Sequence, residues 1–144
     1  MSPISSYALV IYGASGDLTR RKLLPALFNL DCAGKLPRAF RIIGLARSAM
    51  DSKAWQQQAA VAIAGLGDEA QRAAFCERLV YMPIDYDSVA DCERLYDLLY
   101  HCDDCFASQG KVLFHLAVPA TVSETIIRAL GKSRFAPEGR MVGN

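Results

Sequence analysis

Two glycines three residues apart, an acid, a hydroxyl group and three successive cations stand together in the stretch GASGDLTRRKL, residues 13–23. The residues before it, 8–12, are apolar and indicate a strand. A strand, a glycine turn and the start of a helix can bind a nucleotide phosphate. Glycine lets the backbone turn sharply and the phosphate approach, and the helix N-terminus offers free N–H groups at the positive end of its dipole. The stretch therefore predicts a phosphate-binding turn.

The turn departs from two well-known phosphate-binding patterns. Ser15 and Leu18 stand where the common dinucleotide fingerprint has its second and third glycines. No Gly-Lys-Ser or Gly-Lys-Thr follows the two glycines at the spacing of a P-loop. Spacing alone therefore leaves open an ordinary strand-to-helix turn that binds nothing.

The end of the second apolar run, residues 41–45, bears on the identity of the ligand. In dinucleotide-binding folds an acid just after this strand binds the 2′-hydroxyl of NAD, whereas an arginine binds the 2′-phosphate of NADP. Here Ala46, Arg47 and Ser48 follow the run, and the next acid is Asp51. Arg47 can donate two hydrogen bonds to a phosphate, and Ser48 adds a hydroxyl donor. NADP is therefore the predicted cofactor, with a solvated arginine as the alternative.

The three cations of the first stretch are Arg20, Arg21 and Lys22. Consecutive residues of an α-helix are 100° apart, so these side chains are expected to point in three directions and cannot all bind one ligand. A solvated helix face is the ordinary interpretation of such a run.

Composition limits the classes of partner. The 144 residues are 52% hydrophobic and 22% charged with a net charge of +1, which is typical of one folded globular domain. This balance gives no general attraction to nucleic acid or to a membrane surface. The N-terminus lacks a signal-peptide pattern, and the five cysteines are not spaced as a disulfide framework. We expect a cytoplasmic protein that binds neither nucleic acid nor membrane.

Cys102 and Cys105 have the C-x-x-C spacing of redox and zinc sites, and His101 adjoins them. They fall late in a helical segment, beside acids that would raise a thiol pKa, and no second pair of ligands is present. We interpret them as incidental cysteines and predict no metal site.

Four short apolar runs, at residues 7–12, 41–45, 79–84 and 111–118, alternate with longer segments of helical spacing. A parallel return between strands needs a crossover long enough to be a helix, and nearly continuous apolar strands are covered on both faces. The predicted fold class is α/β, a doubly wound parallel sheet of the Rossmann-like dinucleotide-binding type.

Local signals place the helices. The first is expected to begin at Asp17 with a short opening turn, to kink or restart with Pro25 near the first helical position, and to end at Gly34. The other expected signals are an N-cap at Asp51, an interruption at Gly65 and Gly67, a new start at Asp68, and helical spacing over residues 88–107 and 121–130.

The sequence resembles the N-terminal coenzyme domain of the glucose-6-phosphate dehydrogenases over essentially the whole chain. The resemblance rests on GASGDLTRRKL at 13–23, PAL at 25–27, GLARS at 44–48 and FHLAVP at 114–119. It implies oxidation of glucose 6-phosphate at C1 to 6-phosphogluconolactone with hydride transfer to NADP, the first step of the pentose phosphate pathway. It also implies a homo-oligomer that forms through a second domain.

By position, the resemblance gives Lys22 a role in substrate binding. Asp17 receives no role in proton transfer, and we expect it to cap the helix and organise the loop. The resemblance implies cofactor binding by Gly13, Ala14, Ser15, Gly16, Asp17, Leu18, Thr19, Arg20, Arg47, Ser48, Ala117, Val118 and Pro119.

Several features depart from the family pattern. Ala120 and Ser123 replace a proline and an aromatic residue that the family often has after its fourth strand. Neither His101 nor His115 matches the family's catalytic histidine, so we expect no catalytic residue in this chain and negligible activity from it alone. Residues 140–142 turn apolar as if a fifth strand began, so we expect residues 1–144 to be one domain, incomplete at its C-terminus. A stand-alone, non-catalytic domain that binds a dinucleotide or phosphate as a sensor or scaffold is the alternative.

Overall fold

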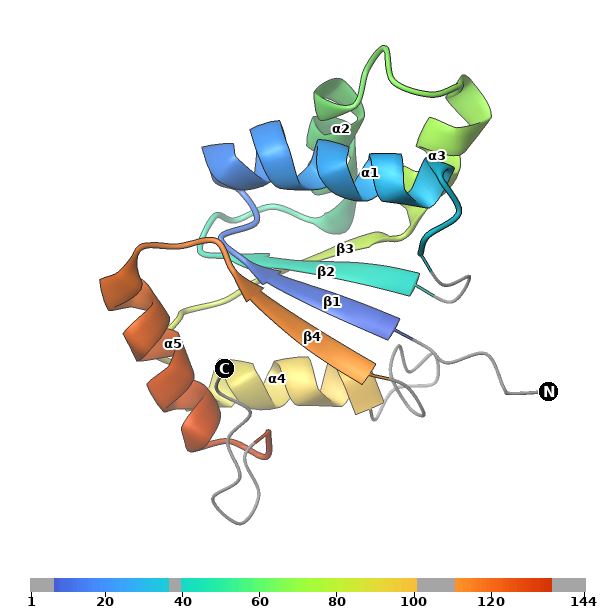
Figure 1. Ribbon diagram of the computed structural model, residues 1–144. Coiled ribbons are helices and arrows are strands. Elements are labelled where there is room, and N and C mark those ends of the chain that lie inside the picture. Colours follow the sequence, from blue (N-terminus) through green and yellow to red (C-terminus); the bar gives the residue numbers. More distant parts are fainter. Residues whose placement is uncertain (1–6, 37–39, 101–110, 136–144) are drawn as a thin grey trace, which may run out of the picture.

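Strands and helices alternate along the chain, in a computed structural model that describes residues 7–36, 40–100 and 111–135 (Figure 1). The elements are β1 (Tyr7–Tyr12), the π-helical turn η1 (Thr19–Leu23), α1 (Leu24–Cys32), β2 (Phe40–Ala46), α2 (Ser52–Ala62), α3 (Glu69–Glu77), β3 (Leu79–Pro83), α4 (Val89–Tyr100), β4 (Lys111–Leu116) and α5 (Ala120–Gly131).

The four strands form one parallel sheet in the order β3-β2-β1-β4. Tyr12 at the end of β1 aligns with Leu45 of β2 and with Leu116 of β4, so the carboxyl ends of these strands lie at one edge. The strand order reverses at β1, because β2 and β4 lie on its opposite sides. Ligands of open α/β sheets bind outside the carboxyl ends at such a reversal.

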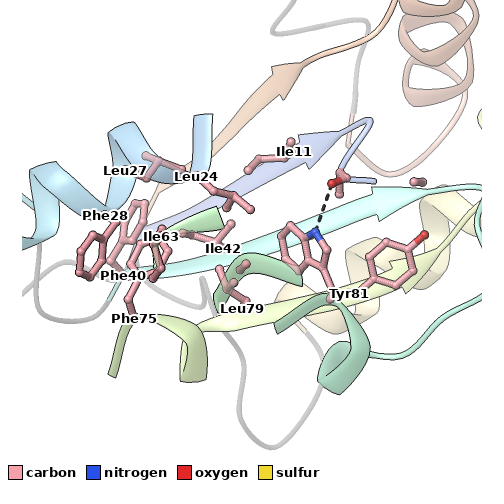
Figure 2. Packing of buried hydrophobic residues seen from close by; sticks show 14 residues of the cluster. Ile11, Leu24, Leu27, Phe28, Phe40, Ile42, Ile63, Phe75, Leu79 and Tyr81 are labelled. Atoms are coloured by element: carbon pink, nitrogen blue, oxygen red, sulfur yellow. Dashed lines mark hydrogen bonds between the residues drawn. The ribbon is translucent and has the colours of Figure 1, made fainter. Parts of the chain in front are cut away.

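Helices cover both faces of the sheet. Figure 1 shows α1, α2 and α3 on one face and α4 and α5 on the other. Side chains of a strand alternate between faces, so Ile11 of β1 packs under α1 to α3, whereas Val10 and Tyr12 pack toward α4 and α5. In the core under α1 to α3, the rings of Phe28 and Phe75 pack edge to face with their centres 5.4 Å apart (Figure 2). The predicted doubly wound α/β fold is confirmed.

The expectation that every strand is covered on both faces is wrong for β4. Phe114 and Leu116 pack against the core under α4 and α5. On the opposite face Leu113 is 51% exposed and His115 is also exposed. β4 is one of the two edge strands of the described sheet, and its face toward α1 lies open in this part of the chain.

The first helix begins at Asp17 and changes its winding before Pro25. Residues Thr19–Leu23 form a π-helical turn, in which the Leu24 N–H donates to the Thr19 carbonyl five residues earlier. α1 then starts at Leu24, with Pro25 in its first turn, where the fixed φ of proline suits the helix. The predicted change near Pro25 is confirmed as a change of winding with Pro25 in the first turn of α1. The 100° spacing expected for the three cations does not hold, because they lie in the π-helical turn.

Short-range capping signals agree with the expected helix ends. The Asp51 carboxylate accepts from the Ala54 N–H at 2.8 Å, and Asp68 forms a reciprocal capping box with Gln71. Gly34 follows α1 with a φ of +72°, and Gly65 and Gly67 also have positive φ between α2 and α3.

Some expectations lie outside the described residues: the end of the helical segment 88–107, the cluster of His101, Cys102 and Cys105, and the apolar segment 140–142. Among the described residues, no helix combines the length and apolar character needed to cross a membrane.

Candidate functional site

The glycine turn follows β1 and is held against both neighbouring strands. Gly13 and Ala14 donate their N–H groups to the Leu45 carbonyl at 2.8 and 3.0 Å. Gly13 has a φ of +89°, and a Cβ there would lie 2.4 Å from the Ala117 carbonyl oxygen and 2.9 Å from Val118 Cγ1. Gly13 is therefore required both by the left-handed backbone and by the close approach of the loop after β4.

Residues at the start of the first helix stabilise this glycine turn by hydrogen bonds to the Gly13 carbonyl. The Gly13 carbonyl accepts the Gly16 N–H and the Thr19 hydroxyl, both at 3.0 Å. Thr19 is fully buried, so its hydroxyl supports the turn from the core side.

The expectation that Asp17 caps the helix is wrong. Its carboxylate forms an ion pair with Arg20 and lies 3.9 Å from Arg21. The arginines three and four residues on are helical neighbours of Asp17 and compete with the backbone for its oxygens. The Arg20 N–H donates to the Gly16 carbonyl at 3.1 Å, whereas the N–H groups of Asp17 and Leu18 have no acceptor among the described residues and stay available to an anion. Lys22 is exposed and forms no ion pair within the described ranges.

Arg47 and Ser48 lie beside the glycine turn, as the sequence predicts for a dinucleotide site. Ser15 Oγ and Ser48 Oγ are 3.2 Å apart, which joins the turn after β1 to the loop after β2. Arg47 is exposed, with its Cζ 5.7 Å from the centre of the Tyr86 ring. The guanidinium is thus oriented by an aromatic face and open to solvent.

Sequence reasoning missed a cavity of about 320 Å³ beside Arg47. Burial raises the pKa of the Tyr86 hydroxyl, while the Arg47 charge partly opposes that rise. The position of Asp85 and Tyr86 just past the end of β3 is the signal that could have located this cavity. Its lining residues are Arg47, Asp85, Tyr86, Asp87, Thr121, Val122 and Thr125.

An aromatic pair beneath the turn was also missed. The indole N–H of Trp55 donates to the Ala14 carbonyl at 3.1 Å, drawn as the dashed line in Figure 2. Tyr81 packs beside Trp55, and its hydroxyl donates to the Ser48 carbonyl at 2.7 Å. A glycine in the middle of β2, Gly44, was the available signal, because a Cβ there would lie 2.5 Å from Trp55 Cη2.

The described part of the chain brings Gly13 to Arg20, Arg47, Ser48 and the loop Ala117 to Pro119 to one edge of the sheet. This arrangement can bind an extended anionic ligand with helix-start N–H groups at one point and a guanidinium at another. No group of three or more His, Cys, Asp or Glu side chains in the described ranges is placed to hold a metal ion.

Comparisons with known proteins give one consistent result. A family model for the glucose-6-phosphate dehydrogenase NAD binding domain matches residues 10–142. The glucose-6-phosphate 1-dehydrogenase of Aggregatibacter actinomycetemcomitans is 33% identical over 92% of this chain, and that of Leuconostoc mesenteroides is 32% identical over 85%. The aligned parts cover 27% and 25% of those relatives, so the chain spans about a quarter of their length.

Solved structures show the same likeness in three dimensions. A glucose-6-phosphate dehydrogenase in complex with its substrate glucose-6-phosphate matches 93% of this chain and 29% of its own, with a TM-score of 0.77 and 26% identity. The enzyme from Mycobacterium avium matches 90% of this chain and 27% of its own, with the same TM-score and 25% identity. The chain belongs to the NAD-binding domain family of the glucose-6-phosphate dehydrogenases and has its dinucleotide-binding α/β fold.

Proposed function

We propose that the dinucleotide is NADP and that Arg47 and Ser48 hold its 2′-phosphate. The observation that carries this proposal is that Asp51, the only acid in the loop after β2, already has a hydrogen-bond partner. Asp51 uses its carboxylate to accept the Ala54 N–H at the start of α2. The loop therefore offers a guanidinium and a hydroxyl, but no carboxylate positioned for a ribose 2′-hydroxyl.

The remaining parts of the coenzyme have places along the same edge. The uncapped helix start after Gly16 supports a pyrophosphate, because its N–H groups and dipole favour negative charge. The cavity between Arg47, Tyr86 and α5 has the size and aromatic wall to take the adenine ring. The loop Ala117 to Pro119 touches Gly13 and is proposed to lie on the nicotinamide side.

We further infer that the chain is the coenzyme domain, over residues 1–144, of an NADP-dependent glucose-6-phosphate 1-dehydrogenase. The names of its relatives and the substrate bound in a structural neighbour support this inference. The bound NADP would accept the hydride that leaves C1 of glucose 6-phosphate. Lys22, exposed near the turn, is proposed to bind the substrate. Neither His101 nor His115 matches the family's base, so this chain alone is expected to be inactive, and the whole enzyme is proposed to be a cytoplasmic homo-oligomer.

Calorimetric titration with NADP and NAD tests the cofactor assignment. Charge-assisted hydrogen bonds contribute about 1.5–3 kcal/mol, so Arg47→Ala should weaken NADP binding about ten- to a hundredfold and leave NAD nearly unchanged. Lys35→Ala is the matched control, because it removes one exposed positive charge after α1, at the opposite edge of the sheet. Equal losses for both dinucleotides, or tighter binding of NAD than of NADP by the unmodified chain, would contradict the assignment.

A further inference from the structure

Two buried aromatic residues contact both loops of the proposed NADP site from the core side. Trp55 of α2 is 1% exposed and Tyr81 of β3 is 5% exposed. Their ring centres are 6.0 Å apart. The indole N–H of Trp55 donates to the Ala14 carbonyl in the glycine turn, and the hydroxyl of Tyr81 donates to the Ser48 carbonyl in the loop after β2.

The hydrogen bond from Trp55 determines where the next N–H group points. A trans peptide unit is planar, with its C=O and N–H on opposite sides, and no cis peptide occurs in the described residues. Because Trp55 draws the Ala14 carbonyl into the core, the Ser15 N–H is directed away from the core. That is the side on which a pyrophosphate would lie, and the Ser15 N–H has no acceptor among the described residues.

Tyr81 acts in the same way on the second loop. Its hydroxyl fixes the Ser48 carbonyl at 2.7 Å, while the Ser48 hydroxyl faces Ser15 at 3.2 Å. The Tyr81 N–H donates to Ser52 Oγ at 2.8 Å, so β3 is tied to the first residue of α2. The ring therefore cannot shift without moving the loop that carries Arg47.

Close packing makes the pair rigid. A Cβ at Gly44 would lie 2.5 Å from Trp55 Cη2 and 2.7 Å from Ala14 Cβ, so the indole fills the space between β2 and the turn. Buried aromatic rings in such contact have few alternative rotamers, and tightly packed interiors transmit displacement.

We propose that Trp55 and Tyr81 are positioning residues that set the geometry between the pyrophosphate turn and the 2′-phosphate loop. Trp55 acts on the part of the coenzyme that NADP and NAD share, and Tyr81 acts on the part that only NADP has. The inference rests on the proposed NADP site, and neither side chain needs to touch the coenzyme.

The test replaces one donor atom at each position. Trp55 is the only tryptophan of the chain, so biosynthetic incorporation of 3-benzothienylalanine exchanges its N–H for sulfur at this site alone and keeps the shape. Tyr81→Phe removes one hydroxyl. Phe28→Leu is the control, because it loosens the same core at a position with no hydrogen bond to either loop. Dissociation constants for NADP and NAD are measured by calorimetry, and folding is followed by thermal unfolding.

We expect the tryptophan analogue to weaken NADP and NAD binding equally, by about three- to tenfold, the effect of one hydrogen bond. Tyr81→Phe should weaken NADP by a similar factor and change NAD binding less than twofold. Folded variants with unchanged affinities, or a Phe28→Leu variant that weakens binding as much, would overturn the inference alone. Failure of the unmodified chain to bind NADP would overturn the proposed function and this inference with it. Tyr81→Phe decides the matter if the analogue does not fold.

Discussion

The Arg47 guanidinium lies over the Tyr86 ring, with Cζ 5.7 Å from the ring centre. The two residues come from the loops after β2 and β3 and meet where the 320 Å³ cavity begins. A cation held over an aromatic face loses less conformational freedom when it binds an anion, so this contact prepares Arg47 for a phosphate.

Loss of the Tyr86 ring should therefore weaken NADP binding. A cation–π contact at an exposed site is worth about 0.5–1 kcal/mol, so Tyr86→Leu is expected to lower NADP affinity by at least two- to fivefold. Tyr86→Phe keeps the ring and should bind NADP like the unmodified chain. Titration followed by calorimetry gives both values. A loss of affinity in Tyr86→Phe would instead assign the effect to the hydroxyl group.

Alanine substitutions at two glycines separate backbone strain from steric contact. Gly13 and Gly34 have φ of +89° and +72°, but only at Gly13 would a Cβ meet other atoms, the nearest 2.4 Å away. Left-handed backbone at a non-glycine residue costs about 1–3 kcal/mol, so both variants should be destabilised. Gly13→Ala should lose more stability than Gly34→Ala in urea unfolding and should also lose NADP affinity. Equal unfolding free energies for the two variants would show that the contact with Ala117 relaxes freely.

The buried thiol of Cys92 is expected to make the free energy of unfolding depend on pH in the alkaline range. Burial in the core under α4 and α5, together with the neighbouring charges of Asp91 and Glu93, raises the pKa of this thiol from 9.0 to about 11. Above pH 9 the unfolded chain releases this proton while the folded chain keeps it. The stabilising contribution of the protonated thiol is therefore fully present below pH 9 and is lost as the pH rises toward 11. The slope from this one group is at most about 1.4 kcal/mol per pH unit.

Cys92→Ala should reduce that slope, whatever its effect on stability at neutral pH. Unfolding free energies from denaturant titrations between neutral pH and the folded-state pKa of about 11 provide the comparison. Burial also raises the pKa of Tyr12 in the same core, so a residual alkaline slope is expected in the variant. Identical slopes with and without the thiol would mean that Cys92 ionises equally easily in both states.

Features set by neighbouring residues were predictable from the sequence. Asp51 and Asp68 cap helices as expected, and Pro25 restarts the first helix, because each depends on partners within a few positions. The strands deviate from their expected bounds by at most two residues, since continuous apolar runs mark them clearly.

Contacts between distant residues were not predictable in the same way. The hydrogen bond from Trp55 to Ala14 spans 41 positions, and the contact of Arg47 with Tyr86 depends on how two loops meet at the sheet edge. Asp17 was misassigned for a local reason, since a helix start and two arginines compete for the same carboxylate with similar energies.

The π-helical turn shifts the angular positions of the side chains before it relative to those after it. Thr19 and Leu24 are five residues apart and would lie about 140° apart around a regular α-helix, yet both are buried. The wider turn absorbs this offset, much as a helix absorbs one inserted residue without displacing its later turns. Leu24 and Phe28 can therefore keep an α-helical alignment with the core while Thr19 keeps the one that the glycine turn needs. A helical wheel drawn through the whole segment would misplace the side chains on one side of the turn, and also Lys22 within it.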